Sequence, residues 1–275
     1  MPVQGNVYML TGPGGNITAH IGADGVLLVD TQTPEAAPRI MTAIRALSSQ
    51  PIRWIINTNV DSDHTGGNDA LSRIGATAAS LGRPRIVAHQ NVVQRMVASP
   101  GVSRDSWPND DYFTPQKDFF FNGEAVVVLH VPAAHTDGDS IVFFRRSDVL
   151  STGDIFTPGR YPVIDVQAGG SVQGLIDGLN TVLRLTVPAK YQEGGTYVVP
   201  GHGRLCDEAD VVEYREMVTV VRDRVQDLIA KKMSLEQVKA ARPTRDYDPE
   251  YGAEPGSKAA DVFVEAVYRS LAGKK

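Results

Sequence analysis

"INTNVDSDHTGGN", residues 56–68, is the stretch of sequence that decides the fold. It begins at the end of the apolar run "WII", residues 54–56, and places Asp61, Asp63 and His64 within four positions. Carboxylate oxygens and imidazole nitrogens are the donors that divalent metal ions use in proteins lacking thiolate ligands. The stretch therefore predicts a buried strand that runs directly into a metal-binding loop.

Three later segments also place a histidine or an aspartate just past a predicted strand. They are "PAAHTDGDS" (132–140), "STGDIF" (151–156) and "VPGHGRL" (199–205). Loops at one edge of a strand layer can converge on a single pocket. Each segment alone is weak, because Asp-Gly and Gly-Asp pairs are usually turns. The occurrence of all four in order in one chain is what predicts a metal centre.

The composition is that of an ordinary globular protein. Of 275 residues, 42% are hydrophobic and 21% are charged, and the formal net charge is −5. We therefore expect neither nucleic acid nor an anionic membrane surface as a partner, and a small molecule as substrate. The N-terminus lacks the basic start and apolar run of a signal peptide. A cytoplasmic protein and an exported protein whose leader was removed both fit this pattern.

The cysteine count restricts the kind of metal site. Cys206 is the single cysteine of the chain. This excludes a disulfide framework and a thiolate-rich zinc site. Any bound metal must be held by histidines and carboxylates.

The order of the predicted elements indicates an α/β chain. Strands are expected at 52–56, 85–89, 124–131 and 139–144, and helices at 34–48, 171–185, 208–231 and 258–272. This alternation favours two mixed sheets packed together with helices outside, in a single domain covering residues 1–275. "TGPGGN", residues 11–16, is predicted to be a hairpin turn rather than a phosphate-binding loop. Residues 98–123 are predicted to form a long loop or lid, with Phe119–Phe121 either over the mouth of a site or in a core strand.

Together the four segments resemble the metallo-β-lactamase superfamily, over about residues 5–205. In words, the family pattern is His-x-His-x-Asp-His, a lone His, a bridging Asp and a final His in Pro-Gly-His-Gly. The residues that fit are Asp63, His64, His135, Asp154 and His202. Asn59 and Asp61 occupy the first two histidine positions, so the motif here is Asn-x-Asp-x-Asp-His. The resemblance implies an αββα sandwich, in which two mixed β-sheets carry helices on their outer faces.

The same resemblance implies two metal positions of unequal quality. One is complete and consists of Asp63, His64 and His202, with Asp154 bridging to the other. The second retains His135 and gains a carboxylate only if Asp61 serves as a ligand. Two imidazoles and two carboxylates suit Zn²⁺, and also Mn²⁺ or Fe²⁺, so one tightly bound Zn²⁺ is expected.

Three functions compete at this stage. The first is a hydrolase in which a metal-bound water attacks an amide, ester or lactone bond of a small molecule, with a β-lactam among the candidate substrates. Asp61 then acts as general base, and Asp61 and Asp63 are the catalytic carboxylates. The second is a two-metal hydrolase in which Asp61 is a ligand. The third is a non-catalytic binding protein on a decayed scaffold, which the retention of one complete ligand set disfavours.

Several neighbouring residues have weaker predicted roles. Asp30 ends the apolar run "GVLLVD" and is expected either to orient a ligand or to cap a turn. Gly66–Gly67 are expected to let the backbone approach the metal. Tyr161 is a candidate for substrate contact. His89 and His130 are expected to be packed side chains rather than ligands.

Overall fold

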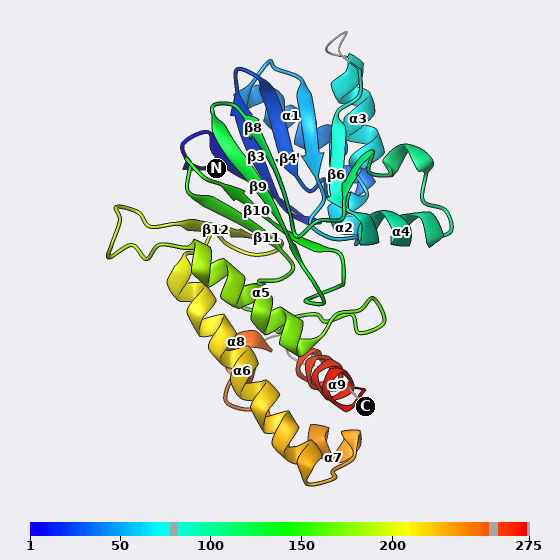
Figure 1. Cartoon of the computed structure of the whole chain (residues 1–275), viewed down its shortest axis with the longest axis vertical. Helices are drawn as coiled ribbons and strands as arrows, with labels where there is room; N and C mark the ends of the chain where they lie inside the picture. The colour runs from blue at the N-terminus through cyan, green and yellow to red at the C-terminus, as the bar shows by residue number, and fades with distance from the viewer. Residues whose placement is uncertain (78–81, 253–257, 274–275) are drawn as a thin grey trace.

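The computed structural model describes residues 1–77, 82–252 and 258–273. Its first 200 residues form two mixed sheets that lie face to face, with helices on the outer faces (Figure 1). This is the αββα architecture that the sequence predicts. None of the helices in the described ranges is both long enough and apolar enough to cross a membrane.

The first sheet has seven strands in chain order. They are β1 (Pro2–Gln4), β2 (Val7–Gly12), β3 (Gly15–Gly22), β4 (Gly25–Val29), β5 (Ile52–Ile56), β6 (Arg85–His89) and β7 (Asp110–Tyr112). The pairs from β1 to β4 are antiparallel, whereas β4 to β7 pair in parallel. The carboxyl ends of β4, β5 and β6 therefore lie at one edge, where loops can carry functional side chains.

The second sheet has five strands in the order β12-β11-β10-β9-β8. They are β8 (Gln116–Phe121), β9 (Glu124–Val131), β10 (Asp139–Phe144), β11 (Val149–Gly153) and β12 (Tyr197–Pro200). All neighbours are antiparallel except β11 and β12, which run parallel. The loops after β11 and β12 consequently leave the sheet side by side.

Apolar side chains alternate along the strands, and this alternation creates separate cores. The inner faces of the two sheets meet in one core that includes Val7, Leu27, Ile56, Val128 and Phe144. The outer face of the seven-stranded sheet packs on α1 and α3, and the outer face of the five-stranded sheet packs on α5 and α6. Burial on both faces explains the nearly continuous apolar runs of β4 and β5.

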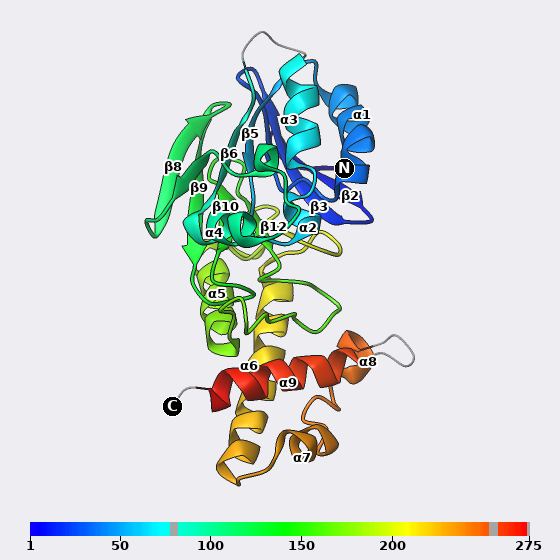
Figure 2. The same ribbon diagram turned by 90° about the vertical axis from the view of Figure 1, so that its right-hand side faces the viewer.

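The helices cover the outer faces of the two sheets and continue beyond them in the C-terminal part of the chain. On the first sheet lie η1 (Pro34–Ala36), α1 (Ala37–Leu47), α2 (Ser62–Thr65), α3 (Asn68–Thr77), α4 (Gln90–Ala98) and η2 (Arg104–Ser106). On the second lie α5 (Val172–Leu185) and α6 (Glu208–Ala230). The chain ends in α7 (Leu235–Ala240), α8 (Asp248–Tyr251) and α9 (Ala259–Ala272). Ser234 and Gln237 form a capping box at the start of α7, and Figure 2 shows α9 lying across α6.

One predicted segment is different in the structure. Residues 98–123 are not a lid, because β7 and β8 lie within them. Phe119 stacks on Trp54 with ring centroids 4.3 Å apart, Phe121 is buried between the sheets, and Phe120 points outward. The alternating exposure of a strand, rather than a site mouth, accounts for the three phenylalanines.

Candidate metal centre

His64 is fixed in orientation by its own sheet. It lies in the one-turn helix α2, just after the loop that follows β5. Its Nδ1 lies 2.8 Å from Oδ2 of Asp30, at the end of β4, and the same carboxylate accepts from the Thr58 amide and hydroxyl at 2.8 and 2.7 Å. A hydrogen bond at Nδ1 leaves Nε2 as the nitrogen that can coordinate a metal ion. Asp30 therefore orients the His64 ring and does not cap a turn.

The backbone of His64 is held as firmly as its ring. Its carbonyl oxygen accepts from the Thr31 amide at 2.9 Å, the Thr31 hydroxyl at 3.0 Å and the Asn57 side chain at 3.0 Å. Asn68 completes this network by bonding to both Thr31 and Asn57. Sequence reasoning missed these residues, although polar side chains directly after a buried strand were a signal for them.

The first group of candidate ligands consists of Asp63, His64 and His202. One donor atom from each lies within 4.8 Å of the others. His202, in the loop after β12, has its Nε2 3.3 Å from Oδ2 of Asp63. His64 is buried, whereas Asp63 and His202 are partly exposed, so the group opens towards solvent on one side.

The second group consists of Asp61, His135 and Asp154, whose donor atoms also lie within 4.8 Å of one another. His135 Nε2 is 3.1 Å from Asp61 Oδ2, and its Nδ1 is 2.9 Å from the carbonyl oxygen of Val163. The ring of His135 is thus oriented by the backbone in the way that the ring of His64 is oriented by Asp30. The Asp61 carboxylate is 44% exposed, so solvent reaches it.

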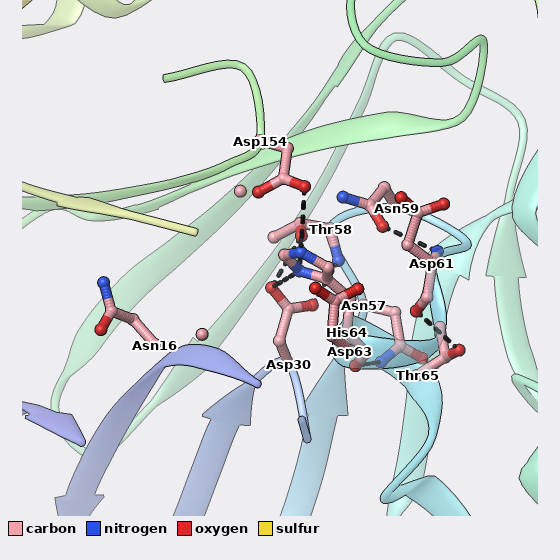
Figure 3. A network of polar contacts seen from close by, with 12 residues as sticks. Asn16, Asp30, Asn57, Thr58, Asn59, Asp61, Asp63, His64, Thr65 and Asp154 are labelled. Carbon is pink, nitrogen blue, oxygen red and sulfur yellow. Dashed lines mark hydrogen bonds and ion pairs between the residues drawn. The ribbon is translucent and has the colours of Figure 1, made fainter. Parts of the chain in front are cut away.

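Asp154 lies between the two groups, in the loop after β11 (Figure 3 shows it above His64). Its Oδ2 is 3.3 Å from His64 Nε2 and 3.9 Å from His135 Nε2, and its Oδ1 is 3.6 Å from His202 Nε2. A single carboxylate, 12% exposed, therefore faces three imidazoles. The structure brings all six predicted site residues together, five around Asp154.

The electrostatics of the centre favour cations. Burial raises the pKa of the Asp154 carboxyl, but His64, His135 and His202 outweigh this effect and lower it far below its ordinary value. Burial lowers the pKa of His135, yet Asp61, Asp139 and Asp154 raise it to about 10. The hydrogen bond with Asp63 raises the pKa of His202. A divalent ion that binds here would have to displace any proton from the imidazole nitrogens that it uses.

Two buried polar atoms indicate where an ion belongs. His64 Nε2 and Asp154 Oδ1 are buried and make no hydrogen bond to the described residues, although His64 Nε2 lies 3.3 Å from Asp154 Oδ2. Such atoms are costly unless something satisfies them. A divalent ion between Asp63, His64 and His202 would satisfy them, and the imidazole and carboxylate donors suit it. The residues present therefore fit a metal ion.

Asn59 belongs to neither group. Its Oδ1 accepts from the Asp61 amide at 2.9 Å, which shapes the loop before α2. Its Nδ2 is buried without a partner among the described residues. An amide engaged in this way does not replace the missing histidine.

Three other candidate residues have different roles from those predicted. Tyr161 cannot touch substrate, because it is buried between Tyr251 and Phe263 and its hydroxyl bonds to Asp248. Gly66 and Gly67 approach the segment after β4 rather than the metal centre. Their small size lets α2 and α3 pack on that segment.

The remaining histidines and loop aspartates behave as packed groups. His89 and His130 stack on each other at 3.6 Å and belong to neither ligand group, as expected. Asp139 accepts from the Thr136 amide at 2.8 Å, just after His135. Asp137 forms a bidentate pair with Arg95 and contributes to the same turn.

The comparison with protein families gives one match. The model described as the metallo-beta-lactamase superfamily matches residues 1–202. This range includes all six predicted site residues and ends at His202.

The solved structures most similar in fold include hydrolases of different kinds. A metallo-beta-lactamase from Pontibacter korlensis is 16% identical, with a TM-score of 0.61, over 80% of this chain and 97% of that one. TMB-1 is 15% identical, with a TM-score of 0.60, over 80% and 95%. The sec-alkylsulfatase Pisa1 from Pseudomonas sp. is 16% identical, with a TM-score of 0.69, over 100% of this chain and 50% of that one. The chain thus spans about half the length of the alkylsulfatase.

Proposed function

The chain belongs to the metallo-beta-lactamase superfamily, and from this premise we propose that it is a metal-dependent hydrolase of small molecules that contain an amide, ester or lactone bond. The observation that carries the proposal is the convergence of Asp63, His64 and His202 beside the largely buried carboxylate of Asp154, where two potential ligand atoms make no hydrogen bond to the described residues. An ion held by these groups would satisfy both atoms.

The group of Asp63, His64 and His202, with Asp154 beside it, would hold one tightly bound ion. Zn²⁺ suits its two imidazoles and two carboxylates, and Mn²⁺ and Fe²⁺ suit them as well. When bound, such an ion lowers the pKa of water towards neutrality and polarises the bond under attack. Asp30 contributes by holding the His64 ring so that Nε2 faces the ion.

In this proposal Asp61 accepts the proton of the attacking water. Its side chain is partly exposed, and its Oδ2 lies 3.1 Å from Nε2 of His135. A general base must reach the water and must be unprotonated at the working pH. The position of Asp61 among the candidate ligands supports the first condition.

A second candidate assigns Asp61 as a metal ligand. The separation of 3.1 Å between Asp61 Oδ2 and His135 Nε2 favours it, because the two atoms lie as close as two ligands of one ion. One imidazole and two carboxylates form a harder donor set than the first group, which favours Mn²⁺ over Zn²⁺ there. The chain would then hold two ions of unequal affinity.

One combined measurement tests the proposal. Elemental analysis of protein dialysed without added metal should give nearer one ion per chain than two. The protein is then assayed with lactone, β-lactam, thioester and phosphodiester substrates. A sec-alkyl sulfate is added to the panel, because the alkylsulfatase matches the whole chain in fold. Two ions per chain would favour the second candidate, and metal without turnover of any substrate would favour a binding protein.

A further inference from the structure

The turn between β2 and β3, "GPGGN" at residues 12–16, lies against the loop that carries His202. Asn16 is 7% exposed and makes three hydrogen bonds to that loop. Its backbone amide donates to Gly201 O at 2.7 Å, and its side-chain amide donates to Pro200 O at 2.9 Å and Gly203 O at 3.0 Å. One side chain therefore spans both ends of the Pro-Gly-His-Gly segment (Figure 3 shows Asn16 in the view of the centre).

Gly15 shows how close the turn comes to the ligand. A Cβ at this position would lie 2.8 Å from Gly201 O and 3.0 Å from Cε1 of His202. Its φ of +98° also lies where residues with a side chain are strained. The turn thus packs on the His202 ring as tightly as glycine allows.

The turn is itself anchored to the loop that holds His64. Gln32 is buried, and its side-chain amide donates to Gly15 O at 2.7 Å. Its backbone carbonyl oxygen accepts from the backbone amide of Gly67, just past α2, at 2.9 Å. Contacts therefore run from the His64 loop through Gln32 and the turn to the His202 loop.

His202 needs this support more than the other two imidazoles do. The Nδ1 atoms of His64 and His135 are fixed by Asp30 and by the Val163 carbonyl. No such bond holds His202 Nδ1 in the described parts of the chain. The backbone must therefore set the direction of the His202 ring, and Asn16 supplies three of the bonds that hold this backbone.

We propose that Asn16 is a positioning residue for His202, which holds the 200–203 loop so that Nε2 faces the same point as the donors of Asp63 and His64. The inference rests on the proposed function, in that a metal ion occupies this point. Removal of a group that orients a ligand typically weakens metal binding about 10- to 100-fold. The effect on Asn16 variants should fall in that range.

The experiment measures Zn²⁺ affinity of the full chain by competition with a chromophoric chelator, beside the melting temperature of the metal-free protein. Asn16→Ala removes the two side-chain bonds, and Asn16→Asp keeps the size but turns a carboxylate towards two carbonyl oxygens. Both should bind Zn²⁺ about 10- to 100-fold more weakly. Asn109→Ala is the matched control, because Asn109 also bonds to backbone but at the opposite ends of the strands. Its Zn²⁺ affinity should stay within about twofold of the unaltered chain.

The possible outcomes distinguish the positioning role of Asn16 from the proposed metal-dependent function. If either folded Asn16 variant has a lower melting temperature but unaltered Zn²⁺ affinity, Asn16 is only structural and the inference is wrong. If the unaltered chain itself fails to bind Zn²⁺, Mn²⁺ or Fe²⁺, the proposed function fails and the inference fails with it. An equal loss of affinity in Asn109→Ala would also overturn the inference, since it would show a global effect.

Discussion

At the scale of single residues, the centre is defined by what stands at positions 59 and 61. The side chain of Asn59 accepts a hydrogen bond from a backbone amide of its own loop, whereas the Asp61 carboxylate faces His135. The two departures from the family motif thus have opposite consequences. One removes a ligand position, and the other places a carboxylate at the mouth of the centre, where ligand and base are both chemically reasonable roles.

The first prediction concerns His202. His202→Ala should remove most of the bound metal and abolish hydrolysis, because it deletes one of two imidazoles from the first group. His89→Ala is the control, since His89 stacks on His130 away from both groups. Elemental analysis after dialysis compares them. Equal metal content in the two variants would show that His202 is not a ligand.

The second prediction concerns Asp61. Asp61→Asn keeps the size of the side chain but removes its basicity, so kcat should fall about 10²- to 10⁴-fold while the tightly bound ion remains. The measurement pairs steady-state kinetics with metal content. Loss of the tightly bound metal from this variant would instead identify Asp61 as a ligand and contradict its assignment as the base.

At the scale of elements, the ligand loops are positioned by what packs behind them. α5 begins at the N-cap Ser171, whose backbone amide donates to the carbonyl oxygens of Ala133 and Ala134, the two residues directly before His135. Gly174, in the first turn of α5, lets the helix contact the Ala133 backbone directly. The helix therefore supports the loop that presents His135, although none of its own side chains belongs to the centre.

The third prediction tests this contact. Gly174→Ala would insert a methyl group against the Ala133 backbone, which cannot move aside as a flexible side chain could. The unfolding free energy should fall by about 1–3 kcal/mol, the usual cost of overpacking. Asp177→Ala, an exposed change on the same helix, should alter it by no more than about 0.5 kcal/mol. Urea denaturation measures the unfolding free energy of both variants. Equal changes in the two variants would show that α5 is free to shift.

At the scale of the whole molecule, the two sheets are joined by a buried polar pair as well as by apolar packing. Nε2 of His20, in β3, lies 3.0 Å from Oε1 of Glu124, in β9. Glu124 also accepts from the Arg146 and Ser147 amides and the Ser147 hydroxyl. Burial raises the pKa of Glu124, but His20 and Ser147 outweigh it and lower the pKa to about 2.

The fourth prediction is the pH dependence that follows. Because the pKa of Glu124 is lower in the folded state, its stabilisation is complete above about pH 4.5 and is lost as pH falls towards 2. The loss should be on the order of 3 kcal/mol. Urea denaturation of metal-free protein at several pH values across this window should show that the unfolding free energy falls less steeply with decreasing pH for Glu124→Gln than for the unaltered chain. Parallel curves would contradict the assigned role of Glu124.

The sequence by itself determined the fold and the set of ligand types. Strand patterns and glycine-rich turns are local, so they predicted β5, β6, β9, β10 and the long helices correctly. The order of the four motif segments identified the superfamily, and the single cysteine restricted the donors to histidine and carboxylate. These conclusions depend on spacing along the chain, which a sequence states directly.

Only the tertiary structure decided which residues meet. Asp61 is 74 positions from His135, and Asn16 is 184 from Pro200, so no local pattern reports either contact. Tyr161 was misjudged for the same reason, because the helices that bury it lie about 90 residues further along. Closing the two sheets brings such segments together at one edge. The geometry of the centre therefore depends on sheet pairing and packing, which the spacing of residues alone does not specify.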